Sequence, residues 1–283
     1  MAPRSAPTAR RLRIGVELRR MRERAGMTAA EASRSLGTTQ AQISNIEANR
    51  FGISAERVRT LAHIYGCTDQ PLVEALADMA ADRTRGWWEE YRDTLPPRLL
   101  DLAEMEHHAT ALRVTQVINI PGLLQTPEHA RALFREAVPA LRPHEIEYRI
   151  SHRIKRQVIL HREQPPPYTA IVHEAALRMQ FGGREVARAQ LKHLAEVSEQ
   201  AGIRLLVIPF DGTSFPTTGH AVDYFHGPVP DLDTVEVDTA HGGELIDAAG
   251  QLEKYRLVLD RMEAVALKPA PSRELIHRIA QDT

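Results

Sequence analysis

Apolar positions near the N-terminus recur at the three- and four-residue steps that place side chains on one face of a helix. Ile14, Leu18 and Met21 define the first such face, and Gly26 ends the predicted helix. Later helical faces carry Ile43 and Ile46, and then Val58, Leu61, Ala62 and Tyr65. Beyond residue 66 the pattern predicts a fifth helix and then a sixth around Trp87-Trp88.

Capping residues set the limits of these short helices. The expected N-caps of the second, third and fourth helices are Thr28, Thr38 or Thr39, and Ser54. Glu31 stands three residues after Thr28, which is the spacing of a capping box. Leu36-Gly37 closes the second helix, because glycine tolerates the positive φ that a sharp helix end requires.

The rest of the chain mixes helical and extended patterns. Helices are expected at residues 99–117, 127–137, 143–162, 184–200 and 252–267. Strands rich in Val, Ile, Tyr and Phe are expected at residues 168–173, 203–209, 221–225 and 234–238. Gly182-Gly183 and Gly242-Gly243 are predicted turns. The fold class expected is therefore mainly α, with a helical N-terminal domain and a mixed α/β, or α+β, body.

Length and composition favour two domains. The chain has 283 residues, and no apolar run approaches the roughly 18–20 residues of a membrane span. Met1 to Arg13 lacks the apolar core of a secretory signal, so we expect a cytoplasmic protein. Cys67 is the only cysteine, which excludes an internal disulfide framework and a cysteine-based zinc module.

Charge is distributed unevenly along the chain. Residues 1–66 hold twelve arginines and five glutamates, a net charge of +7, whereas the remainder holds 24 basic and 32 acidic residues, a net charge of −8. Clustered arginines favour a polyanionic partner, because neutralising phosphates releases their counterions. The N-terminal segment is thus the part expected to meet nucleic acid, although a solvated arginine-rich surface would have the same composition.

The segment from Ala29 to Glu47 has the spacing of a helix-turn-helix, the motif that presents its second helix to a major groove. Ile43 and Ile46 would hold that second helix against the others, which turns Gln40, Ala41, Ser44 and Asn45 outward. Glutamine and asparagine can each form two hydrogen bonds to an adenine edge. Thr38 and Thr39 lie at the positive end of the same helix, where a phosphate would bind.

Leu12 to Gly66 resembles the five-helix DNA-binding domain of the lambdoid phage repressors and Cro, and LGTTQAQISNIE at residues 36–47 is the most similar stretch. The resemblance implies a Cro/C1-type (XRE) helix-turn-helix regulator whose base-reading positions are Gln40, Ala41 and Asn45. Two positions depart from the family pattern: Ala29 replaces a glutamine that contacts phosphate, and Ser33 replaces a buried alanine. The full set of candidate DNA contacts is Thr28, Thr38, Thr39, Gln40, Ala41, Gln42, Ser44, Asn45, Asn49 and Arg50.

The body also resembles a family, the antitoxin-like transcriptional regulators of high-GC Gram-positive bacteria, whose C-terminal domain was formerly a domain of unknown function. The resemblance covers roughly Pro97 to Ile276, and the segments that carry it are IPGLLQT (120–126), HEAALR (173–178), QLKHL (190–194) and residues 203–209. It implies a small co-encoded partner protein and a regulatory role. Glu236 stands where the family pattern favours an aromatic residue.

Two groups of polar residues in the body are candidates for binding. Arg149, Arg153 and Arg156 recur on one predicted helix face, where they would either bind an acidic segment of a partner or neutralise glutamates of their own domain. A polar cleft is the second candidate, and surface ion pairs and helix caps are its alternative. Its expected lining is His173, Glu174, Arg178, Arg153 and Arg156, joined by His220 and Asp223 across the loop at residues 212–219.

Sequence motifs for catalysis are absent. His173-Glu174 begins like the helical zinc-protease motif, but the position of its second histidine is Leu177. The chain also lacks a G-x-S-x-G elbow, a phosphate-binding loop and a G-x-G-x-x-G motif. We therefore expect no enzyme, no cofactor and no metal.

These observations predict a disordered arm at residues 1–10, a helix-turn-helix domain at 11–80, a helical linker at 81–97 and a dimerisation and signal- or partner-binding domain at 98–283. The expected function is that of a dimeric regulator that binds double-stranded operator DNA and no membrane. The alternative is an antitoxin-like subunit that neutralises a small co-encoded partner protein and regulates its own operon.

Overall fold

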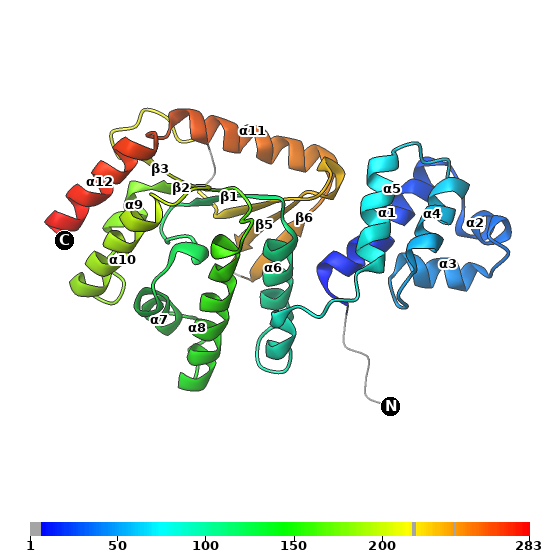
Figure 1. The fold of residues 1–283 in the computed structure, drawn as a ribbon, viewed down its shortest axis with the longest axis horizontal. Coiled ribbons are helices and arrows are strands. Elements are labelled where there is room, and N and C mark those ends of the chain that lie inside the picture. The colour runs from blue at the N-terminus through cyan, green and yellow to red at the C-terminus, as the bar shows by residue number, and fades with distance from the viewer. Residues whose placement is uncertain (1–6, 217–218, 240) are drawn as a thin grey trace. The chain divides into compact units, whose positions relative to one another are not determined.

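The computed structural model describes residues 7–216, 219–239 and 241–283, which form two compact units. The N-terminal unit runs to Glu89 and takes in Leu99–Glu104, and the C-terminal unit comprises Glu90–Arg98 and Met105–Thr283. Figure 1 shows the elements of both. The expected arm at residues 1–10 falls mostly outside the described residues, and its last two residues already belong to the first helix.

Residues 7–89 of the N-terminal unit contain five α-helices, in agreement with the apolar pattern. They are α1 (Ala9–Arg24), α2 (Ala29–Ser35), α3 (Gln40–Glu47), α4 (Ala55–Ile64) and α5 (Gln70–Ala81). Their core includes the fully buried side chains of Leu18, Ile43, Leu61 and Leu76. The sixth helix expected around Trp87-Trp88 is a short 3-10 helix, Trp87–Tyr91.

Helices α1 to α4 in this unit end with the same pattern of backbone hydrogen bonds, and the end of α2 is an example. After α2, the Thr38 N–H donates to the Ser33 carbonyl at 2.9 Å and the Gly37 N–H donates to the Arg34 carbonyl at 3.2 Å. This pair of bonds is the Schellman motif, and Gly37 has the left-handed φ of +66° that it requires. The starts of the helices also follow the sequence: Thr28 and Glu31 form the capping box, and Ser54 caps α4.

The C-terminal unit carries the remaining elements, except that Leu99–Glu104 of the first of them, α6, belongs to the N-terminal unit. In chain order the helices are α6 (Pro97–His108), α7 (Pro127–Arg135), α8 (Pro143–Gln157), α9 (Glu174–Arg178), α10 (Arg184–Val197), α11 (Ala249–Val265) and α12 (Pro269–Asp282). The strands are β1 (Ala111–Gln116), β2 (Tyr168–His173), β3 (Ile203–Ile208), β4 (Val222–His226), β5 (Thr234–Thr239) and β6 (Gly242–Ile246). Single 3-10 turns are at Gly122–Leu124, Val158–His161 and Pro230–Leu232.

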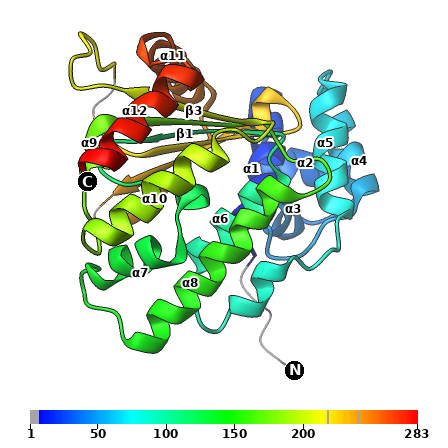
Figure 2. The same ribbon diagram turned by 60° about the vertical axis from the view of Figure 1, so that its left-hand side comes forward.

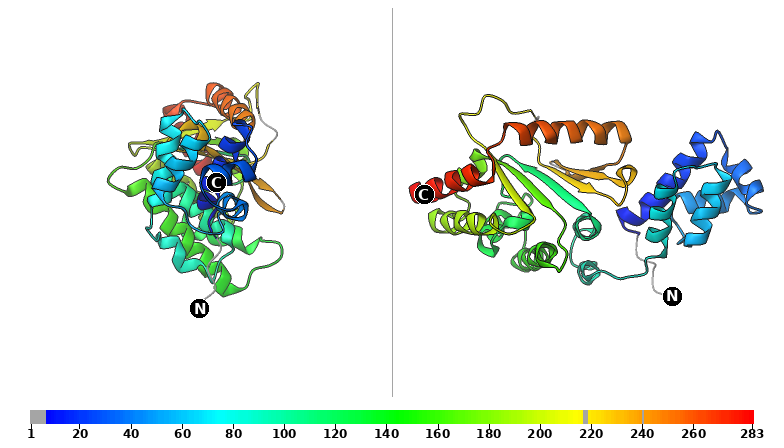
Figure 3. Two further views of the ribbon diagram at one scale, coloured as in Figure 1. Left: turned by 90° about the vertical axis from the view of Figure 1, so that its right-hand side faces the viewer. Right: turned by 45° about the horizontal axis from the view of Figure 1, so that its top comes forward.

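These strands form one mixed sheet in the order β3-β2-β1-β4-β5-β6. The first three are parallel and the last three are joined antiparallel. Helix α11 covers one face, where Leu252 and Leu259 pack on Val222, Tyr224 and Val235. Helices α7, α8 and α10 lie on the opposite side of the sheet (Figures 1 and 2), as the right-hand view of Figure 3 also shows.

Two predictions for the body were wrong, and one helix was missed. The helix expected at residues 99–117 ends at His108, and Ala111–Gln116 is strand β1, paired in the middle of the sheet. Gly242-Gly243, expected as a turn, begins strand β6. The final helix α12 was not predicted. The four strands that were predicted are all present within one or two residues.

The described residues contain no helix with both the length and the apolar character needed to cross a membrane.

Candidate DNA-binding surface

Helix α3 presents a polar face on an apolar support. Ile43 is fully buried and fixes the inner side of the helix, and Ile46 is partly buried. The side chains of Gln40, Ala41 and Ser44 are exposed, and Asn45 is partly exposed. The orientation predicted from the isoleucine spacing is therefore present in the structure. The outward face carries two amides and a hydroxyl, groups that can bond base edges.

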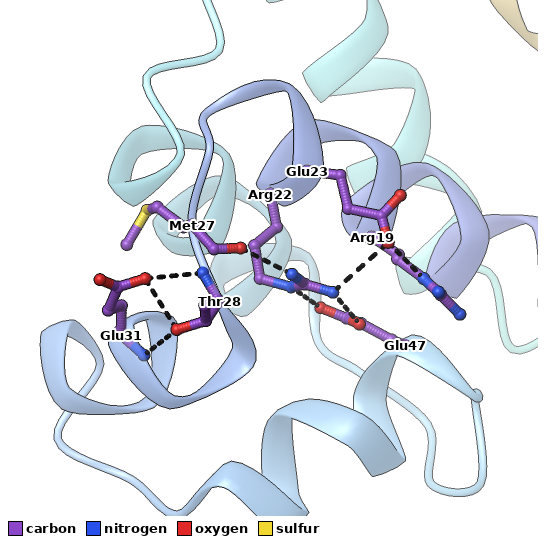
Figure 4. Close-up of polar contacts among 7 residues, drawn as sticks. All are labelled: Arg19, Arg22, Glu23, Met27, Thr28, Glu31 and Glu47. Atoms are coloured by element: carbon purple, nitrogen blue, oxygen red, sulfur yellow. Dashed lines mark hydrogen bonds and ion pairs between the residues drawn. The ribbon is translucent and has the colours of Figure 1, made fainter.

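An ion pair ties α3 to α1. The Arg22 Nε and Nη2 donate to the two carboxylate oxygens of Glu47 at 2.6 and 2.9 Å, and Arg22 Nη1 donates to the Met27 carbonyl at 2.7 Å (Figure 4). Both side chains are about nine-tenths buried. The hydrogen bonds to Glu47 raise the pKa of the Arg22 guanidinium. This two-pronged contact fixes the C-terminal end of α3 in both position and orientation.

Close packing at Gly15 supports the same end of α3. A Cβ at this position would overlap the carbonyl oxygen of Glu47 and crowd that of Ile46. Only glycine therefore lets α1 approach the last turn of α3 so closely. Arg22, Glu47 and Gly15 were not among the predicted site residues. A signal was present in the sequence, since Arg22 stands four residues after the core residue Leu18 on a buried helix face.

Residues predicted to contact DNA also form the start of α3 and the turn that follows its end. Thr39 caps the start, since its Oγ1 accepts from the Gln42 N–H at 3.3 Å. Asn49 follows the end with a left-handed φ of 47°, and the Arg50 N–H bonds the Asn45 carbonyl at 2.9 Å. The Arg50 Nη1 also donates to Asn45 Oδ1 at 3.3 Å. Arg50 thus orients the amide that faces outward, whereas Asn49 forms the turn.

The other predicted contacts have local roles as well. Thr28 Oγ1 accepts from the Glu31 N–H at 3.2 Å and donates to Glu31 Oε2 at 2.7 Å, so the capping box already engages it. Thr38 is partly buried and Gln42 is exposed. Ser33 fits its buried position because its hydroxyl donates to the Ala30 carbonyl at 2.8 Å.

Several exposed arginines of this unit have no carboxylate partner. Within the part of the chain that the structure describes, no carboxylate lies within ion-pair distance of four exposed arginines, Arg24, Arg34, Arg50 and Arg57. By contrast, Arg19 pairs with Glu23 and Arg59 pairs with Glu74, both at the surface. Arginines without acidic neighbours remain available to phosphates.

The arginines of α8 are directed into their own unit. Arg156 is 5% exposed and donates through Nε and Nη2 to Glu106 at 2.7 and 2.5 Å. Arg153 donates to Gln125 Oε1 and lies over the Phe134 ring at 5.1 Å from its centroid. Arg149 is partly buried and donates to the Glu145 carbonyl at 3.4 Å. For Arg156, this geometry favours the alternative in which the stripe neutralises a glutamate of its own domain.

The residues of the expected cleft are divided between two groups. Arg153, Arg156 and Asp223 interact electrostatically with one another. Glu174 instead accepts from Arg178 and from the Phe210 N–H at 2.8 Å, and His173 caps α9. His220 is exposed, and residues 217 and 218 of its loop lie outside the described residues. Among those described, no three His, Cys, Asp or Glu side chains are arranged to hold a metal.

Family models match both halves of the chain. A model described as a helix-turn-helix domain matches residues 13–76, and a model described as a domain of unknown function (DUF5753) matches residues 99–278. The chain belongs to the DUF5753 family. The helix-turn-helix match indicates a DNA-binding regulator, which is a non-enzymatic role. No protein of curated function matches the chain, and no solved structure matches it either.

Proposed function

We propose that this protein is a sequence-specific DNA-binding transcriptional regulator that inserts α3 into a major groove. The observation that carries the proposal is the exposed polar face of α3 on a support fixed by Ile43 and the Arg22–Glu47 pair. Gln40 and Asn45 are the residues for base recognition, since each amide both donates and accepts. Ala41 offers a methyl group to thymine, and Ser44 offers a hydroxyl.

Phosphate contacts complete the proposed interface. The N-terminus of α3, with Thr38 and Thr39, carries the partial positive charge of the helix and unpaired backbone N–H groups. Arg50 lies just beyond the other end of α3 and has no acidic partner among the described residues. In the Cro/C1-type pattern that the segment resembles, such groups position the reading helix and carry no sequence information themselves.

We further propose that the protein acts as a two-fold dimer and that its C-terminal unit provides the dimer contact and the regulatory input. One reading helix covers only a few base pairs, so adequate specificity usually comes from two copies on adjacent half-sites. The acidic charge of residues 67–283 supports this division, because such a surface is a poor partner for DNA.

Arg156, the last arginine of the α8 stripe, is assigned a structural role in this proposal. The sequence left two roles open for Arg149, Arg153 and Arg156, which were to bind an acidic segment of a small partner or to neutralise glutamates of their own domain. Arg156 is buried and doubly bonded to Glu106, so releasing it for a partner would leave a buried carboxylate unpaired.

Two experiments test the proposed function together. One selects the duplexes that the protein binds from a pool of random DNA, and the other maps the sites that it occupies across the genome. We expect one inverted-repeat motif whose half-sites lie about 10 base pairs apart, one turn of the double helix. Sedimentation of the full chain at micromolar concentration should then give a dimer. Enrichment of no motif would contradict sequence-specific recognition, and a monomer bound to a single half-site would contradict the dimer.

A further inference from the structure

Helix α11 has one side against the sheet and one side toward solvent, which is called its outer side here. Leu252 and Leu259 are buried against the sheet. None of the other described helices or strands of the C-terminal unit lies over the outer side (Figures 1 and 3). At its centre is Leu257, which is 59% exposed, whereas the other two exposed leucines, Leu12 and Leu245, are 40% and 38% exposed. A single exposed leucine is ordinary, so its surroundings decide what this side can bind.

Charged residues form two edges on either side of Leu257. Glu253 and Asp260 lie on one edge, seven residues apart, and Lys254 and Arg261 lie on the other at the same spacing. With about 100° of rotation per residue, each edge lies roughly 40–60° from Leu257, in opposite directions around the helix. All four charged residues are exposed. The outer side of α11 thus has an apolar centre between an acidic edge and a basic edge.

These two edges do not neutralise each other within the chain. Among the described residues, the side chains of Glu253, Lys254 and Arg261 take part in no hydrogen bond or ion pair. Asp260 Oδ1 lies 2.8 Å from Arg113 Nη2, but the Asp260 side chain remains 64% exposed. Arg113 also pairs with a second carboxylate of α11. Both edges are therefore available to a partner.

We propose that the outer side of α11 binds the outer side of α11 in a second copy of this chain, with the two helices parallel. A two-fold axis parallel to the helices sets Leu257 against Leu257 of the second copy. It also places the acidic edge of each copy opposite the basic edge of the other, so that Glu253 faces Lys254 and Asp260 faces Arg261. This contact rests on the dimer of the proposed function and assigns that dimer a surface.

Charge decides between the possible partners and orientations. A nucleic acid, or a protein surface of one charge, would be attracted by one edge and repelled by the other. An antiparallel pair of α11 helices would place acidic edge beside acidic edge and basic edge beside basic edge. Two parallel copies match both edges at once. Surface ion pairs each contribute little affinity, so the edges set the orientation of the contact more than its strength.

Sedimentation equilibrium of the full chain, without DNA, measures this contact. The wild type should be dimeric at micromolar concentration. Leu257→Asp should weaken dimerisation at least tenfold, because it would place two carboxylates against each other at the centre of the contact. Since Leu257 is exposed, the circular dichroism spectrum should not change. Ile154→Asp is the matched control, because it introduces the same charge at a 44% exposed position of α8. That variant should dimerise as the wild type does.

Two charge variants test the parallel orientation. Glu253→Lys combined with Asp260→Lys makes both edges basic, and Lys254→Glu combined with Arg261→Glu makes both edges acidic. Each double variant alone should dimerise at least tenfold more weakly than the wild type, because four opposite-charge contacts are lost. An equimolar mixture of the two should form a heterodimer with about the affinity of the wild type. Dimerisation of either double variant alone as strong as that of the wild type would overturn the parallel pairing.

The remaining outcomes separate the surface from the dimer itself. A Leu257→Asp protein that dimerises as the wild type does would overturn the assignment of α11 and leave the dimer standing. Equal loss of dimerisation in Leu257→Asp and Ile154→Asp would overturn that assignment as well. A wild-type chain that stays monomeric would overturn both the surface and the dimer, whereas base recognition by α3 would still be decided by the selected DNA motif.

Discussion

At the scale of single residues, His129 shows how burial decides a protonation state. It lies in α7 and is 1% exposed, and among the described residues neither of its ring nitrogens has a hydrogen-bond partner. Its ring contacts Phe181 edge to face, with centroids 5.9 Å apart. Burial, and then the charge of Arg153, lower the pKa of His129 from 6.5 to about 4. The imidazole is therefore neutral near pH 7.

This shift predicts an acid-sensitive step in stability. The unfolded chain takes up a proton on His129 near pH 6.5, whereas the folded chain does so only near pH 4. Stability should therefore fall as the pH is lowered from about 6.5 to about 4. Melting temperatures measured across this range should fall less steeply for His129→Gln than for the wild type. The exposed His144→Gln controls for the loss of one titrating group, and equal slopes for all three proteins would rule this explanation out.

At the scale of elements, the position of α3 depends on its contacts with α1. Glu47→Ala would leave the Arg22 guanidinium buried without its carboxylate, which typically costs about 3–5 kcal/mol. Glu74→Ala is the matched control, because Glu74 is half exposed and pairs with Arg59 at the surface. Its loss should cost less than about 1 kcal/mol. Calorimetric unfolding of the full chain measures both, and equal small effects would show that the buried pair does not anchor α3.

Gly15→Ala probes the same contact through sterics. The added Cβ overlaps the Glu47 carbonyl, so α1 and α3 must separate, at a cost of about 1–3 kcal/mol. Gly250→Ala in α11 has open space around the new Cβ and should be neutral or slightly stabilising. The first variant should also lose DNA affinity, because the reading helix shifts. A Gly15→Ala protein as stable as the Gly250→Ala protein would contradict the close packing described here.

The sequence predicted well those helices in which the spacing of apolar residues and the capping residues indicate the same limits. Helices α2 and α4 have an N-cap and a turn glycine within a few residues, so their limits follow from local chemistry. Strand β1 was missed because Leu112 and Val114 continue the apolar pattern of the preceding helix, and only pairing with β2 and β4 makes the segment extended. Strand β6 was missed because Gly242-Gly243 resembles a turn.

For the candidate site, local spacing predicted which side chains of α3 face outward, but not the contacts that hold the helix in place. Ile43 and Ile46 sufficed to place Gln40 and Asn45 on the outer face of α3. The contacts that hold α3 were not predictable, since Arg22 and Glu47 are 25 residues apart and their pairing depends on how α1 and α3 pack. In the body, likewise, Glu106 and Arg156 are 50 residues apart, and no local pattern connects them.

At the scale of the whole molecule, charge is distributed unevenly between the two parts of the chain. Residues 1–66 carry a net charge of +7 and include the proposed reading helix, and the rest carries −8. In the proposed function, phosphate contacts made by the basic part set the affinity for any DNA, whereas base contacts from α3 set the choice of sequence. A single substitution can therefore distinguish the affinity for any DNA from the additional affinity for one sequence.

The most direct test of base recognition by α3 compares two variants, Gln40→Ala and Asn45→Ala. Their binding to the selected site and to a scrambled duplex is measured at one fixed salt concentration. Each variant should lose about 1–3 kcal/mol on the selected site, because one two-point contact to a base is removed. Binding to the scrambled duplex should barely change, since phosphate contacts dominate it. Gln70→Ala, an exposed glutamine of α5, should bind both duplexes as the wild type does. Equal losses on both duplexes, or no loss on either, would contradict base recognition by α3.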